Sequence, residues 1–86
     1  MRTMTITEAD LQSTIFRLLG QIAPEADFET LDLNVDVREA LDIDSFDFLN
    51  FLIALDEVYG VDIPETDYGK LVSVEDIVQY LQARIA

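Results

Sequence analysis

The stretch from Ser45 to Tyr59 constrains the fold most, because its apolar residues recur at helical spacing on two separate arcs. A helix in a small bundle normally buries one such arc and keeps the opposite side polar. The first arc comprises Phe48, Leu52, Leu55 and Tyr59. The second arc lies about 130° away at 100° per residue; it comprises Phe46, Leu49 and Ile53 and is rimmed by Asp47, Asn50, Asp56 and Glu57. The pattern predicts a helix with one core face and one apolar docking face inside an acidic rim.

Three other segments also have helical signals, and two of them begin with a capping-box pattern. Thr7 and Ser73 are each followed three residues later by an acidic residue. Pro64 suits the start of a shorter helix, because its fixed φ matches helical geometry. The sequence therefore predicts an all-α fold, a small bundle of three main helices plus a short fourth. The predicted helices cover about 8–19, about 45–59, about 65–70 and about 74–85.

A long connection over about residues 20–44 separates the first two predicted helices. Within it, Leu31, Leu33, Val35 and Val37 alternate with polar residues, a pattern typical of a strand. A lone strand has no partner here and would not be stable. We therefore expect an ordered loop whose apolar side chains fill the core, with one helical turn over 38–41. An alternative is that this loop covers the second arc of the 45–59 helix.

The residue types that are missing exclude most chemistry. The chain has 86 residues, enough for a single domain over 1–86 and too few for two cores. It contains no cysteine and no histidine, which excludes disulfides, thiolate metal sites and the commonest general base. An EF-hand loop starting at Asp42 fails because Phe46, Asp47 and Ile53 occupy positions that need a ligand, a glycine and a glutamate. We therefore expect no enzyme activity, no catalytic residue and no metal site.

The net charge of the chain narrows the choice of partners. Eighteen acidic residues against five basic ones give a formal net charge of −13. Nucleic acid and anionic membrane surfaces would repel such a chain. No apolar run approaches the roughly 20 residues that span a bilayer, and no signal-peptide pattern follows Arg2. We expect no membrane span and a cytoplasmic location. The negative charge would either keep the protein soluble or steer it toward basic partners.

Asp44 and Ser45 begin the 45–59 helix, and both are favoured N-cap residue types. In one interpretation Ser45 is only a cap, which is the commoner role for this residue type. In the other, Asp44 caps the helix, and Ser45 is the first helical residue with a free, exposed hydroxyl. A phosphodiester on that hydroxyl would lie at a helix N-terminus, where backbone N–H groups and the dipole favour an anion.

From Leu41 onward, the order of motifs resembles the acyl carrier protein family. Residues 44–46 (DSF) are similar to the family's Asp-Ser-Leu. Three later stretches also match: LDEVYG at 55–60, VDIPE at 61–65 and LVSVED at 71–76. The likeness is close from Leu41 to the end and looser over residues 1–30. The ordered set is far more specific than Asp-Ser-Leu alone.

The resemblance implies that Ser45, next to Asp44, receives 4′-phosphopantetheine from coenzyme A through a phosphopantetheinyl transferase. The thiol of this arm would hold acyl groups as thioesters, as in fatty acid biosynthesis and lipid metabolism. The carrier would be a monomer, and its partners would be acyl-activating, acyltransferase or ketosynthase-type enzymes with basic docking patches. The implied contact positions are the apolar Phe46, Leu49 and Ile53 and the acidic Asp44, Asp47, Asp56 and Glu57.

Several positions depart from the family pattern, and one of them, Gly69, weakens the end of the short 65–70 helix. Asp42 stands where the family often has glycine, Phe46 replaces leucine, and Asn50 replaces a common glutamate. These changes favour a dedicated carrier in a specialised pathway over a housekeeping one. The Asp-Ser-Phe variant is also similar to D-alanine carrier proteins. Two alternatives stay open: an aminoacyl carrier of the D-alanine type, and an unmodified adaptor that binds partners through the 45–59 helix.

Overall fold

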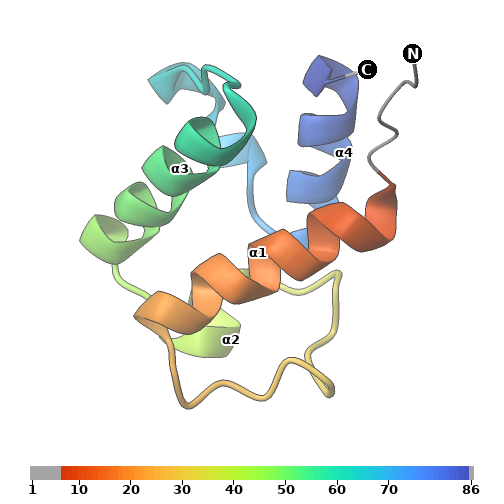
Figure 1. The fold of residues 1–86 in the computed structure, drawn as a ribbon. Coiled ribbons are helices and arrows are strands. Elements are labelled where there is room, and N and C mark those ends of the chain that lie inside the picture. Colours follow the sequence, from red (N-terminus) through yellow and green to blue (C-terminus); the bar gives the residue numbers. More distant parts are fainter. Residues whose placement is uncertain (1–6, 86) are drawn as a thin grey trace.

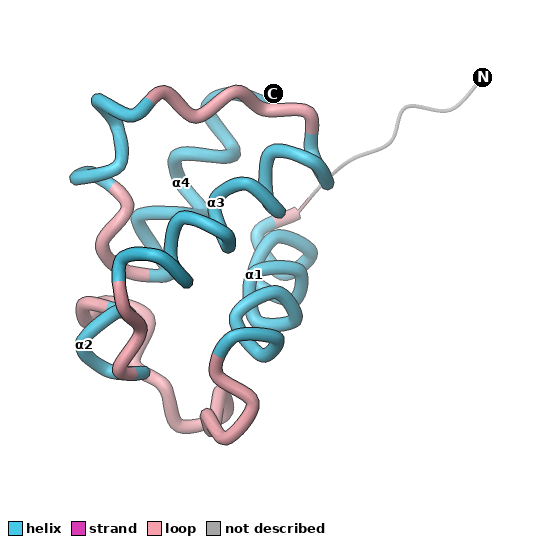
Figure 2. The backbone as a smooth tube through the Cα atoms, turned by 90° about the vertical axis from the view of Figure 1, so that its left-hand side faces the viewer, coloured by secondary structure: helices cyan, strands magenta, loops and turns pink. Residues whose placement is uncertain are grey.

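The computed structural model describes residues 7–85, and every regular element in that range is helical (Figure 1). The long helices are α1 (Glu8–Ile22), α3 (Ser45–Tyr59) and α4 (Val74–Ile85). The short elements are α2 (Val37–Leu41) and the 3₁₀ helix η1 (Glu65–Lys70). Figure 2 shows the same helices joined by loops, without a strand in the described range. The predicted all-α fold is confirmed.

The core lies where α1 packs against both α3 and α4. Leu11 and Ile15 of α1, Leu55 of α3 and Ile77 of α4 have no exposed surface. The first apolar arc of α3 faces this core, with Phe48, Leu52 and Leu55 buried and Tyr59 half-buried. Phe51 is buried as well, although neither predicted arc includes it. It lies about 60° from Phe48 at 100° per residue, so the core face is wider than predicted.

Helix α1 extends three residues beyond the predicted end at about residue 19. Gly20 does not terminate it: the backbone stays helical to Ile22, and the ring of Phe28 lies close to Gly20. A Cβ on Gly20 would be 3.7 Å from Phe28 Cε2, and the Phe28 ring stacks on Phe16 with centroids 5.2 Å apart. The helix ends at Ala23, whose N–H donates to Leu19 O, and Pro24 follows. The helix therefore continues through Gly20 and stops just before Pro24.

The connection after α1 is an ordered loop that docks on the segment between η1 and α4. Val37 N donates to Val72 O at 2.9 Å, and Glu75 N donates to Leu33 O at 3.0 Å. These two bonds tie the loop and the start of α2 to residues 72–75, and no strand pairing occurs in the described range. Of the four alternating residues, Val37 is buried and Leu31 and Leu33 are partly buried against the core. Val35 is exposed, so the expectation that it fills the core is wrong.

Both predicted capping boxes are present. Thr7 Oγ1 accepts from Asp10 N, and Asp10 Oδ2 accepts from Thr7 N, each at 3.1 Å. Ser73 and Asp76 make the equivalent pair of bonds at the start of α4. At the end of α3, Gly60 adopts the left-handed conformation with φ of 65°, which a residue without a Cβ reaches at least cost. None of the helices in the described range has the length and apolarity needed to cross a membrane.

Candidate attachment site

The turn between α2 and α3 positions Ser45. Asp42 ends α2 in a left-handed conformation (φ 55°, ψ 49°), and Ile43 N then donates to Arg38 O at 2.9 Å. Asp44 is the N-cap of α3, and its Oδ1 accepts from Asp47 N at 2.8 Å. Ser45 is therefore the first helical residue, and its side chain is exposed. The capping bond is made by Asp44, so the hydroxyl of Ser45 is not needed to satisfy the helix start.

Arg38 of α2 contacts this hydroxyl, and the sequence did not predict this contact. Its Nη2 donates a hydrogen bond to Ser45 Oγ at 2.8 Å, and its guanidinium carbon lies 5.7 Å from the Phe48 ring centroid. The hydroxyl is thus exposed as expected, but the expectation that it is free is wrong. The only feature of the sequence that pointed to this contact is the scarcity of basic residues: Arg38 is the one basic residue between Arg17 and Lys70.

The second apolar arc of α3 lies open at the surface. Phe46 is 71 % exposed, Ile53 48 % and Leu49 38 %. The alternative in which the preceding loop covers these residues is wrong, because that loop packs toward α4 and the core instead. We refer to Phe46, Leu49 and Ile53 as the exposed stripe. Of the acidic residues expected beside it, Asp44, Asp56 and Glu57 are exposed and Asp47 is half-buried.

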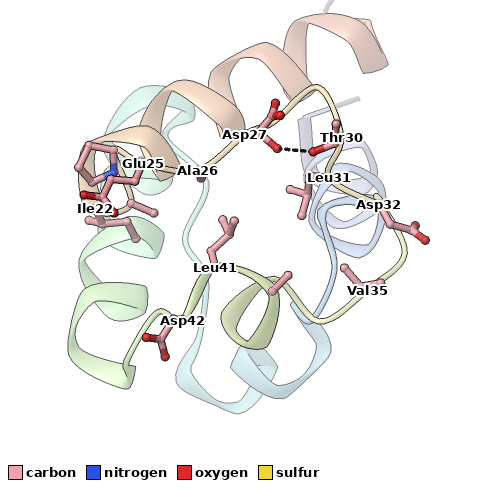
Figure 3. Close-up of a pocket in the computed structure, with 13 residues that line it drawn as sticks. Ile22, Glu25, Ala26, Asp27, Thr30, Leu31, Asp32, Val35, Leu41 and Asp42 are labelled. Atoms are coloured by element: carbon pink, nitrogen blue, oxygen red, sulfur yellow. Dashed lines mark hydrogen bonds between the residues drawn. The ribbon is translucent and has the colours of Figure 1, made fainter.

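The structure also contains an open hollow of about 810 Å³ (Figure 3). The end of α1, the following loop and α2 line it, and Leu31 and Leu41 extend toward its middle (Figure 3). Glu25, Asp27 and Asp42 give it an acidic rim. Neither Ser45 nor the exposed stripe lines it, so it is separate from the α3 surface.

Comparison with known proteins places the chain in a family. A family model described as "Phosphopantetheine attachment site" matches residues 10–81. The acyl carrier protein of Helicobacter pylori G27 is 35% identical over 77 residues, covering 85% of this chain and 87% of that protein. The acyl carrier protein of Campylobacter hominis is 33% identical over 61 residues, covering 71% and 72%.

A solved structure shares the fold. It is the solution structure of an Anaplasma phagocytophilum protein provisionally named an acyl carrier protein. It superposes with a TM-score of 0.80 at 18% sequence identity, covering 98% of each chain. At that identity, the likeness supports the fold alone.

These matches, together with the all-helical fold, define a phosphopantetheine-bearing carrier domain. The chain belongs to the acyl carrier protein family, and its cofactor is 4′-phosphopantetheine.

Proposed function

We propose that Ser45 is the attachment residue and that the protein carries acyl groups as thioesters on the arm. The position of the hydroxyl is the observation that carries this proposal. Ser45 is exposed at the first position of α3, while Asp44 makes the capping bond. A phosphodiester on Ser45 would lie where the helix dipole and the first backbone N–H groups favour negative charge. The residues present therefore fit the group.

The attachment reaction is a phosphoryl-type transfer on a partner enzyme. Ser45 Oγ forms a bond to the phosphorus of the pantetheine half of coenzyme A. The pyrophosphate bond breaks, the nucleotide half leaves, and the serine proton passes to a base on the transferase. When attached, the arm supplies a terminal thiol that holds acyl groups, which gives thiol chemistry to a chain without cysteine.

The exposed stripe and its acidic rim are the proposed docking surface for the transferase and for acyl-handling enzymes. Phe46 lies next to the proposed attachment residue and is the most exposed large apolar side chain within residues 7–85. An apolar centre with a charged rim is the usual composition of a protein interface. Basic patches on acyltransferase or ketosynthase-type partners would complement the chain's net charge of −13. In this role the protein is a carrier and does not itself catalyse.

Intact mass spectrometry after incubation with coenzyme A and a promiscuous phosphopantetheinyl transferase tests the attachment residue. We expect the wild type to gain one phosphopantetheine and Ser45→Ala to gain none. Ser13→Ala is the matched control, because Ser13 is an exposed serine on α1; this variant should load like the wild type. Loading of Ser45→Ala would show that another residue is modified.

An unmodified adaptor is the second candidate, and the exposed stripe is the observation that favours it. Such an adaptor needs Phe46, Leu49 and Ile53 but not the hydroxyl of Ser45. Absence of a mass gain with several transferases, together with retained partner binding by Ser45→Ala, would favour the adaptor. Loss of carrier activity in a folded Ser45→Ala variant would favour the carrier.

A further inference from the structure

Within residues 7–85, Arg38 is the one basic residue that hydrogen-bonds to Ser45, the proposed attachment residue. Its Nη2 is 2.8 Å from Ser45 Oγ. Glu39, Asp42 and Asp44 are all close in sequence, yet within residues 7–85 no carboxylate oxygen lies within 4.0 Å of the Arg38 guanidinium. Both ion pairs in that range involve Asp67 instead. The positive charge of Arg38 is therefore directed at a neutral hydroxyl in a strongly acidic chain.

The backbone around Arg38 is held by buried neighbours. Val37 is 1 % exposed and its N–H donates to Val72 O, which fixes the start of α2. Ile43 is buried, and its N–H donates to Arg38 O, which fixes α2 against the start of α3. The guanidinium thus extends from a braced turn toward Ser45. The side chain itself is already held by its hydrogen bond to Ser45 Oγ and by the Phe48 ring, which reduces the side-chain entropy lost when the guanidinium binds a ligand at this position.

We propose that Arg38 is a positioning residue that binds the phosphodiester of the attached arm. The inference rests on attachment at Ser45. Once the phosphate is bonded to Oγ, its two non-bridging oxygens lie next to the atom that Arg38 already reaches. A guanidinium binds phosphate oxygens through charge-assisted hydrogen bonds, frequently two in parallel. Arg38 would hold the base of the arm against the α2–α3 turn and offset the negative charge that loading adds.

The test compares apo and loaded forms of the wild type, Arg38→Ala, Arg38→Lys and Arg17→Ala. Arg17 is an exposed arginine on α1, so its substitution removes the same charge away from the site. Mass spectrometry first establishes loading of each variant. Phosphorus NMR of the loaded forms then reports the surroundings of the phosphodiester, and thermal unfolding reports the change in melting temperature on loading.

We expect the phosphorus resonance to move in Arg38→Ala and to stay in place in Arg17→Ala. Loading should lower the melting temperature of Arg38→Ala by on the order of 2–4 °C more than that of the wild type, because an exposed ion contact contributes modestly. Arg38→Lys should recover part of both effects, since lysine restores the charge without the planar fork.

The outcomes separate the inference from the function on which it rests. A loaded Arg38→Ala with the wild-type resonance and the wild-type thermal shift would overturn the role of Arg38 and leave attachment at Ser45 intact. Equal changes in Arg38→Ala and Arg17→Ala would mean that only the net charge of the protein matters, and this result would also overturn the role of Arg38. A wild type that gains no mass would overturn both proposals.

Discussion

The hydroxyl of Tyr80 donates a hydrogen bond to Asp67 Oδ2 at 2.6 Å, joining η1 to α4. Arg84 Nη2 reaches the same oxygen at 3.2 Å, and Lys70 Nζ lies 3.2 Å from Asp67 Oδ1. The Arg84 guanidinium also lies over the Tyr80 ring, 3.9 Å from its centroid. Asp67 is only 8 % exposed, and both of its carboxylate oxygens contact side chains of the protein. The Tyr80 hydrogen bond, followed by that of Lys70, holds the pKa of Asp67 below its ordinary value of 3.8.

The lowered pKa of Asp67 predicts an acid-sensitive link between η1 and α4. A carboxyl group whose pKa is depressed by folding stabilises the folded state at pH values above its unfolded pKa. That stability is lost as the pH falls below about 3.8 through the folded-state value. We expect Asp67→Asn to be less stable than the wild type at neutral pH, with the difference shrinking below pH 3.8. Chemical denaturation at a series of pH values measures this difference.

Asp62→Asn is the control for that experiment, because Asp62 is an exposed carboxylate in the segment before η1. It removes the same charge without touching Tyr80 or Arg84. A stability difference between Asp67→Asn and wild type that stays constant down to pH 2 would contradict the linkage.

The two apolar arcs of α3 should respond differently to truncation. Leu52 is 2 % exposed, so Leu52→Ala should lower the free energy of unfolding by about 2–5 kcal/mol through lost burial and a residual cavity. Phe46 is 71 % exposed, so Phe46→Ala should change it by less than about 0.5 kcal/mol. Denaturant titration gives both values.

The Phe46→Ala variant should nevertheless raise the KM of the transferase for this carrier, because Phe46 belongs to the proposed docking surface. An unchanged KM would argue against docking on the exposed stripe.

Asp42 ends α2 in a left-handed conformation, which glycine adopts at least cost. Aspartate enters this region more readily than most residues, and its φ of 55° ends α2 as glycine would. We expect Asp42→Gly to fold normally. It should exceed Asp42→Ala in stability by about 1 kcal/mol, because the Cβ of alanine is strained in the left-handed conformation and glycine has no Cβ. Urea denaturation of both variants measures the difference. Equal stability would mean that the turn changes conformation in Asp42→Ala.

Self-repulsion predicts a salt-dependent melting temperature. The net charge is −13, and both ion pairs within residues 7–85 involve the same carboxylate, Asp67. Raising the ionic strength from about 0.01 to 0.15 M shortens the Debye length from about 30 to 8 Å, which should raise the melting temperature. The described residues contain no acidic cluster arranged to hold a metal. Magnesium should therefore stabilise gradually, and a sharp stoichiometric transition would contradict this expectation.

The helices were predictable because their signals are local. The capping pairs at Thr7 and Ser73 and the core arc of α3 depend on residues three or four positions apart, and the structure has all of them. The end of α1 was missed, because Gly20 is helical here although glycine commonly ends a helix. The contacts of Asp67 were missed because its partners Tyr80 and Arg84 lie 13 and 17 residues away.

The sequence by itself determined the helical class, the helix starts and the two arcs of α3, because the periodicity of a helix and its capping bonds are short-range properties of the chain. Only the tertiary structure decided which arc is buried and where the long loop packs. It also decided that Arg38 contacts Ser45, because side-chain contacts across a turn depend on how α2 is braced. Burial and charge contacts depend on what surrounds a residue, and that is fixed only when the helices have packed.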